Sequence, residues 1–150
     1  AVVTATLLDH PLALDQFGAK ARQPQEFVLA AIRALSPRSR QIANMRRGTI
    51  ARVFRGPLRA MDQLPGGAPG PDGWPEEAEA WITPNGLATR ISWAMAVPRS
   101  LTPDLPDPRE FVLTTLGDLA EPRTLFAARA AEQRWEGVGL ILAAPEFNRR

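Results

Sequence analysis

Residues 65–81, PGGAPGPDGWPEEAEAW, limit what this chain can fold into more than any other stretch. The first eleven of them hold four prolines and four glycines. Proline lacks a backbone donor and glycine loses the most backbone entropy on ordering, so neither a regular helix nor a strand fits there. Trp74 and Trp81 follow seven residues apart, and such large side chains bring enough apolar area to hold an irregular segment against a core. The sequence therefore predicts an ordered loop at about residues 65–82 that joins two helical halves.

The length and composition are those of a globular protein. The 150 residues are 45% hydrophobic and 23% charged, which predicts one domain over residues 1–150. A chain of this length buries about 68 to 70% of its unfolded surface, enough to fold alone. It opens on Ala1 and an apolar run instead of an initiator methionine, so we interpret it as the C-terminal fragment of a longer protein.

Helical spacing recurs along the chain, and no stretch alternates like a half-buried strand. Residues 25–35, QEFVLAAIRAL, are nearly apolar all round and predict a central helix. Residues 38–64 predict a longer and a shorter helix, divided by Gly56 and Pro57. The predicted fold class is all-α, a compact array of six or seven short helices with one long ordered Pro/Gly/Trp loop.

The second half offers clear helix starts. Thr83 precedes a proline and predicts an N-cap, while Asp107 and Glu110 predict a capping box. Further helices are predicted after Pro122 and before Pro145. The side chains expected to face inward in this half are Leu87, Ile91, Ala94, Met95, Phe111, Val112, Leu116, Leu119, Leu125, Phe126, Ala128, Trp135, Val138, Ile141 and Leu142.

Catalytic and metal-binding motifs are not found in the sequence. There is no cysteine, and the single histidine, His10, is expected to be a cap or surface residue. No serine lies in a G-x-S-x-G elbow, and PGGAPG lacks the lysine and hydroxyl residue of a phosphate-binding loop. The sequence thus predicts no catalytic residue, no metal site and no cofactor. No apolar run is long enough to span a membrane.

Arginine dominates the basic residues. Seventeen of the eighteen are arginine, and eight lie between Phe27 and Met61, where no acidic residue occurs. Arg52, Arg55 and Arg59 share one stripe if the helix continues through Gly56, and they are candidate binding residues. Three interpretations stand: contact with a polyanion such as nucleic acid, glycan or lipid headgroups; a solvated face; and pairing with carboxylates of the last third or of another domain. We favour pairing, and nucleic acid is disfavoured because Phe54 is the one aromatic residue among these arginines.

Four phrases, taken in order, resemble the C-terminal part of a large bacterial family known as domain of unknown function 1800. They are QEFVLAAIRAL at 25–35, PGPDGWPEEAEAWI at 69–82, LATRISWAMA at 87–96 and LILAAPEFNRR at 140–150. The resemblance spans nearly the whole chain and implies an exported or periplasmic protein. The acidic PEEAEA run departs from the glycine-rich turn usual in that family, and the family offers no agreed catalytic residues to carry over.

Two functions follow as hypotheses. The first is a structural or binding module that packs on a missing N-terminal part of its own chain or on a protein partner. The alternative is part of a hydrolase-like enzyme, with carbohydrate as a candidate substrate, whose catalytic groups lie mostly upstream. In that case Trp74 and Trp81 would stack on sugar rings. Otherwise both indoles are buried anchors, which is the interpretation we favour.

Overall fold

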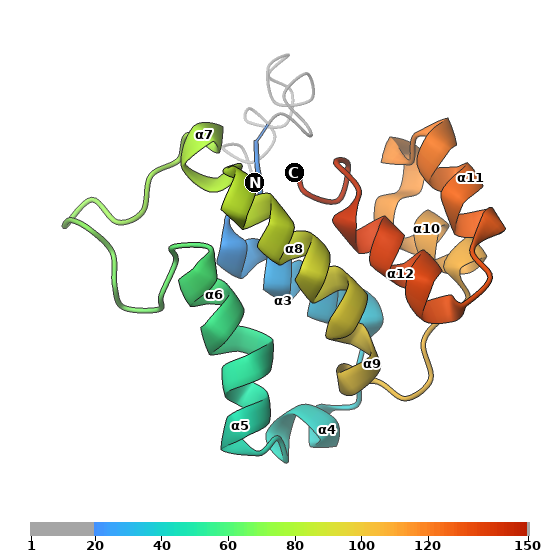
Figure 1. Cartoon of the computed structure of the whole chain (residues 1–150), viewed down its shortest axis with the longest axis horizontal. Helices are drawn as coiled ribbons and strands as arrows, with labels where there is room; N and C mark the ends of the chain where they lie inside the picture. Colours follow the sequence, from blue (N-terminus) through green and yellow to red (C-terminus); the bar gives the residue numbers. More distant parts are fainter. Residues whose placement is uncertain (1–19, 150) are drawn as a thin grey trace, which may run out of the picture.

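The structure is a computed structural model that describes residues 20–149, and the described part is helical (Figure 1). Its helices are α3 (Pro24–Leu35), α4 (Ser39–Ala43), α5 (Arg47–Ile50), a π-helical turn (Ala51–Arg55), α6 (Gly56–Ala60), α7 (Ala78–Trp81), α8 (Pro84–Ala96), α9 (Pro98–Leu101), α10 (Pro108–Leu116), a 3-10 turn (Gly117–Leu119), α11 (Pro122–Ala130) and α12 (Arg134–Ala143). Within residues 20–149 there is no β-strand, and the isolated bridges are Ala21–Arg149 and Gly70–Gly73. The all-α prediction is confirmed. The prediction for His10 and the apolar run before it lies outside the described residues.

Proline and short polar side chains set the helix starts, as the sequence predicts. Thr83 caps α8, since its Oγ1 accepts a hydrogen bond from the Gly86 amide at 3.0 Å. Asp107 caps α10 through the Arg109 amide at 2.9 Å, whereas the capping box predicted the amide of Glu110. An aspartate side chain is short, and here it reaches the second amide of the turn instead of the third.

The helix predicted to break or kink at Gly56 and Pro57 changes there from a π-helical turn into α6, without leaving the helical conformation. Residues 47–60 form one helical run in which five residues adopt the wider π-helical turn, and the Gly56 amide donates to the carbonyl of Ala51. The wider turn gives the ring of Pro57 room that an α-helical turn does not offer. Residues 38–64 are therefore divided into more and shorter segments than predicted, with α4 set apart from the run by residues 44–46.

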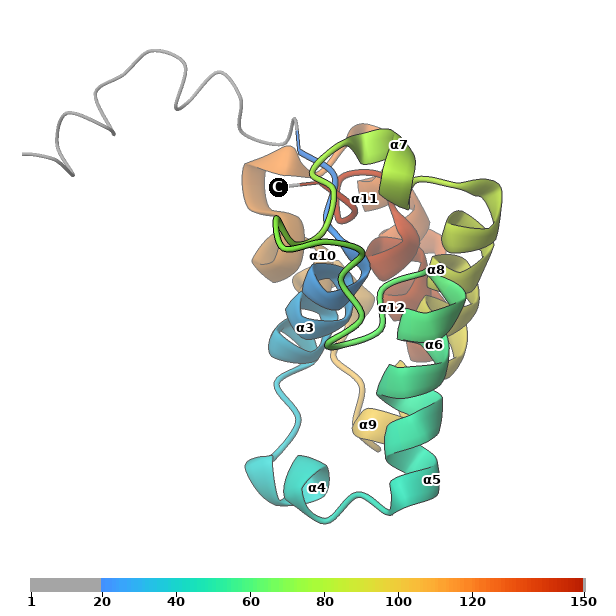
Figure 2. The same ribbon diagram turned by 90° about the vertical axis from the view of Figure 1, so that its left-hand side faces the viewer.

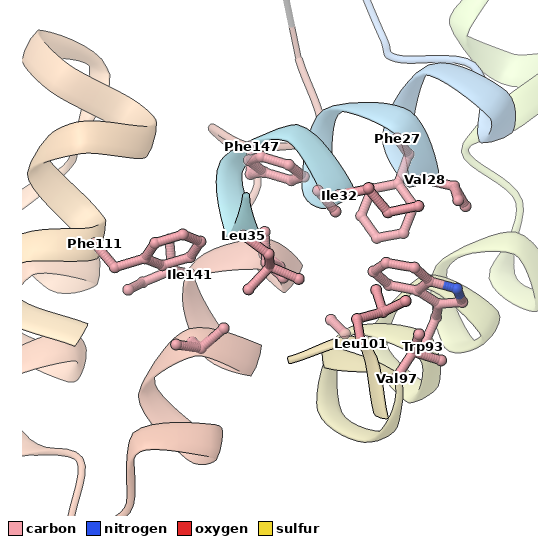
Figure 3. Close-up of a cluster of buried hydrophobic side chains, with 14 of the residues drawn as sticks. Phe27, Val28, Ile32, Leu35, Trp93, Val97, Leu101, Phe111, Ile141 and Phe147 are labelled. Atoms are coloured by element: carbon pink, nitrogen blue, oxygen red, sulfur yellow. The ribbon is translucent and has the colours of Figure 1, made fainter. Parts of the chain in front are cut away.

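The core lies where α3, α8 and α12 meet (Figure 3). The ring of Phe27 on α3 makes edge contacts with Trp93 of α8 at 5.5 Å and with Phe147 of the C-terminal tail at 5.8 Å between centroids. Gly139 allows α8 and α12 to approach closely. A Cβ at this position would overlap Met95 Sδ and lie 3.2 Å from the carbonyl oxygen of Ala94. The central place of α3 is as predicted, although Leu29 on its outer face is 57% exposed.

The predicted inward face is partly wrong in two helices, although Ala94 on α8 and Ala128 on α11 are buried as predicted. On α8 the buried residues are Gly86, Arg90, Trp93 and Ala94, while Leu87 and Ile91 are 38% and 50% exposed. Trp93 has the largest ring on this helix, and α8 is oriented so that the stripe with Trp93 faces the core. On α11, Phe126 is 73% exposed, whereas Thr124 and Ala128 face the core.

Candidate functional site

The C-terminal tail, residues 144–149, lies against the segment that precedes α3. The Arg22 amide donates to the carbonyl of Asn148 at 2.8 Å, and Ala21 forms an antiparallel bridge with Arg149. Residues from the start and the end of the described chain are thus held side by side. This contact forms the floor of the site described below.

A buried arginine ties α8 to this tail. Arg90 is 1% exposed, and its guanidinium donates to Asn148 Oδ1 at 3.0 Å and to the carbonyl of Arg22 at 2.7 Å. Its Cζ also lies 5.1 Å from the centre of the Phe27 ring. Burial lowers the pKa of Arg90 to about 10, because the charged form has lost its hydration.

The partners of Arg90 are neutral. No ion pair to Arg90 occurs among residues 20–149, and its Nε is buried there without a hydrogen-bond acceptor. Asn148 is in turn held by its own amide group, which donates to the carbonyl of Ala144 at 2.9 Å. Arg90 therefore fastens helix, entering segment and tail together. The sequence did not reveal this role of Arg90, because its one signal there is an arginine three positions before Trp93, on the same stripe of the helix as the indole.

A cleft of about 480 Å³ opens beside this fastening, and we call it the tail cleft. It is lined by Ala21, Ala78, Glu79, Ile82, Leu87, Ala143, Pro145, Asn148 and Arg149. The walls are mainly apolar, with Glu79 and Arg149 as the charged groups. Its size and lining are typical of binding sites for apolar groups, which commonly measure about 300 to 1,000 Å³.

Exposed apolar side chains extend the tail cleft along α8. Leu87 lines the cleft, and Ile91 lies one helical turn further on the same side of the helix. Ile82, between α7 and α8, is also exposed and lines the cleft. These three residues form a hydrophobic strip that the described part of the chain leaves uncovered.

The tryptophan loop positions one wall of the cleft. Trp81, the last residue of α7, is 3% exposed, and its indole Nε1 donates to the carbonyl of Pro75 at 2.9 Å. Trp74 is half-buried, and its ring meets that of Trp81 edge-on, with centroids 5.8 Å apart. The burial of Trp81 is as expected for an anchor, whereas Trp74 is less buried than predicted.

Two contacts fix this loop to the entering segment. Gln23 Nε2 donates to the carbonyl of Pro75 at 3.1 Å, and Lys20 pairs with Glu76 at 3.0 Å. Residues 65–69 of the same loop are exposed, and the loop swings away from the helices in Figure 1. Only the half of the loop that carries the two indoles is packed. Leu87, at the start of α8, faces the cleft.

The three candidate arginines lie elsewhere. Arg52, Arg55 and Arg59 are exposed along the run from α5 to α6, and none of the five predicted site residues lines the tail cleft. The pairing expected between the arginines of residues 27–61 and the acidic residues of the last third is not found within residues 20–149. Figure 1 gives the reason, since α4, α5 and α6 lie on the opposite side of the molecule from α10 and α11.

Among residues 20–149, no three His, Cys, Asp or Glu side chains converge as a metal-binding group. None of the helices in that range has the length and hydrophobicity needed to cross a bilayer.

The model of a family described as protein of unknown function, DUF1800, matches residues 1–149. No curated protein and no solved structure matches the chain.

Proposed function

Because the chain belongs to the DUF1800 family, whose function is unknown, we propose a role from the site itself: a helical binding module whose tail cleft receives an apolar segment of its own polypeptide from before residue 1. The observation that carries this proposal is the uncovered strip of Ile82, Leu87 and Ile91 beside the apolar cleft. Burying such a strip is favourable by about 25 cal/mol per Å² of apolar surface.

The entry point of the chain supports this choice of occupant. Ala21, which follows the first described residue, is part of the cleft wall. A segment that is covalently linked upstream of Ala21 therefore has a high effective concentration at the cleft. A separate protein would have to reach the same surface from solution.

The charged groups of the cleft suit a polypeptide. Glu79 and Arg149 carry opposite charges and lie among apolar walls. Glu79 can accept hydrogen bonds from backbone amides or pair with a basic side chain, and Arg149 can donate to backbone carbonyls or pair with an acidic side chain. A hydrolytic role would draw its remaining groups from outside the described residues, since Glu79 is the one carboxylate in the lining. The binding role needs no catalytic groups from elsewhere.

Hydrogen–deuterium exchange tests the proposal. We compare the backbone exchange of residues 78–91 and 143–149 in the full-length gene product with that in the present 150-residue chain. Both segments should exchange more slowly in the full-length protein, because the occupant covers them. Equal exchange in the two proteins would exclude an occupant from before residue 1.

A matched pair of variants links any protection to the cleft. Leu87→Ser with Ile91→Ser in the full-length protein should return both segments to the exchange rate of the isolated chain. Leu113→Ser is the control, because Leu113 is also exposed, at 58%, but lies on α10. Loss of protection in the control as well would show that the effect is not specific to the strip.

A further inference from the structure

One end of the molecule combines arginines with exposed isoleucines. We call it the arginine tip, and it consists of Arg38, Arg40, Ile42, Arg46, Arg47 and Ile50, on α4, α5 and the residues next to them. All six side chains are exposed. Within residues 20–149 none of these four arginines forms an ion pair. The tip therefore presents an uncompensated positive field to whatever approaches it.

The position of the tip makes it accessible to a flat surface. In both views α4 and α5 lie at the same end of the molecule, and the C-terminal tail lies at the other (Figures 1 and 2). Arg52, Arg55 and Arg59 continue the positive charge away from the tip along the run to α6. A surface that contacts the tip thus meets α4 and α5 first.

The isoleucines distinguish among anionic partners. Single-stranded nucleic acids are bound through phosphate contacts together with aromatic platforms, and Phe54, half-buried, is the aromatic residue of this region. Ile42 and Ile50 offer no stacking surface, but aliphatic side chains beside arginines are suited to the boundary between lipid headgroups and acyl chains. Arginine also forms bidentate bonds with phosphate.

We propose that the arginine tip docks on an anionic lipid surface, with its arginines on headgroup phosphates and its two isoleucines in the headgroup boundary. This inference rests on a different surface from the tail cleft and stands independently of the function proposed above. Clusters of four to eight basic residues suffice for such binding, and each one near the surface strengthens it about fivefold. The interaction should weaken as salt rises, because exposed charges are screened.

Vesicle sedimentation tests the inference directly. The chain should sediment with vesicles of phosphatidylcholine mixed with phosphatidylglycerol, and remain in solution with vesicles of phosphatidylcholine alone. Arg46→Gln with Arg47→Gln should lower the partition constant about 25-fold, on the fivefold estimate for each arginine. Arg109→Gln with Arg129→Gln, which removes the same charge from α10 and α11, should lower it about threefold or less, as expected for a change in net charge alone. Equal loss in both pairs, or no binding by the wild-type chain, would overturn the proposal.

A second probe separates lipid from other polyanions. Ile42→Ser with Ile50→Ser should lower vesicle binding at least tenfold and leave binding to heparin unchanged, because heparin offers charge without an apolar layer. Vesicle binding that survives this substitution would show that the tip recognises charge only. Binding to heparin without binding to vesicles would assign the tip to a soluble polyanion instead.

Discussion

The indole Nε1 of Trp93 donates a hydrogen bond to the backbone carbonyl of Val53 at 2.8 Å, across 40 residues of sequence. In an uninterrupted α-helix this carbonyl would accept from the amide of residue 57, but Pro57 has no amide hydrogen. Trp93 supplies the missing donor from α8. The proline that was expected to break the helix is thus accommodated by a π-helical turn on one side and a tryptophan on the other.

Removing the indole donor of Trp93 should lower the free energy of unfolding most while Pro57 is present. Trp93→Phe keeps most of the buried ring but leaves a buried carbonyl without a partner, which costs about 1 to 3 kcal/mol. In a Pro57→Ala background the same substitution should cost less, since residue 57 then carries an amide. Urea unfolding of the two single variants and the double variant measures the coupling, and strict additivity would contradict the link between Trp93 and Pro57.

Asn148 should be among the most sensitive polar residues. Asn148→Ala removes an acceptor from the buried Arg90 guanidinium and a donor from the carbonyl of Ala144, so the free energy of unfolding should fall by about 2 to 3 kcal/mol. Asn44→Ala is the matched control, because Asn44 is exposed, and its effect should stay within about 0.5 kcal/mol. Similar small losses for both variants in urea unfolding would mean that Arg90 is satisfied without Asn148.

The two loop tryptophans should differ in their contribution to stability. Trp81→Ala deletes a buried ring and its bond to Pro75, and should cost about 3 to 5 kcal/mol. Trp74→Ala should cost about half of that, because the ring is half-buried and its recorded ring contact is with Trp81. Melting temperatures of both variants decide the point, and a larger shift for Trp74 would reverse the assignment of Trp81 as the anchor.

Glu146 should make the fold sensitive to acid. Burial acts to raise the pKa of Glu146, but the Thr124 hydroxyl at 2.7 Å and the Glu121 amide at 3.1 Å both donate to Oε1, and the net result is a pKa below the ordinary value. A lowered pKa contributes stability above the unfolded value of about 4.3, and that contribution is lost as the pH falls through the folded value.

A comparison of wild type with Glu146→Gln tests whether the stability that Glu146 contributes is lost as the pH falls. Urea midpoints measured from about pH 6 down to about pH 3 should converge at the acid end, because the wild type loses the advantage of its ionised carboxylate. Glu132→Gln, at an exposed glutamate, is the control and should run parallel to the wild type. A constant difference between wild type and Glu146→Gln over this range would contradict the lowered pKa.

Local chemistry allowed much of the fold to be predicted. Proline at the start of a helix and the Thr83 cap depend on neighbouring residues alone, so the sequence reveals them. The face that a helix buries depends on its neighbours in space. Leu87 and Ile91 are apolar and have helical spacing, yet α8 buries Trp93 instead. The indole of Trp93 donates a hydrogen bond to the carbonyl of Val53, in the π-helical turn.

The site was harder to predict than the fold. The tail cleft is assembled from Ala21, the region around α7 and the last residues of α12 and the tail, and no single stretch of sequence carries its signature. Arg90 was missed because burial of an arginine without a carboxylate contradicts the usual rule for charges. The arginine cluster was visible in the sequence, but its placement on one end of the molecule was not.

The bridge between Ala21 and Arg149 means that the polypeptide enters and leaves this helical array at one point. A unit with adjacent ends can be spliced into a surface loop of a host protein without forcing the host's chain apart. For the same reason the order of its helices can be permuted. A short linker from Arg149 back to Lys20, with new ends opened in the exposed residues 65–69, would leave the contacts of Phe27, Trp93 and Phe147 in place.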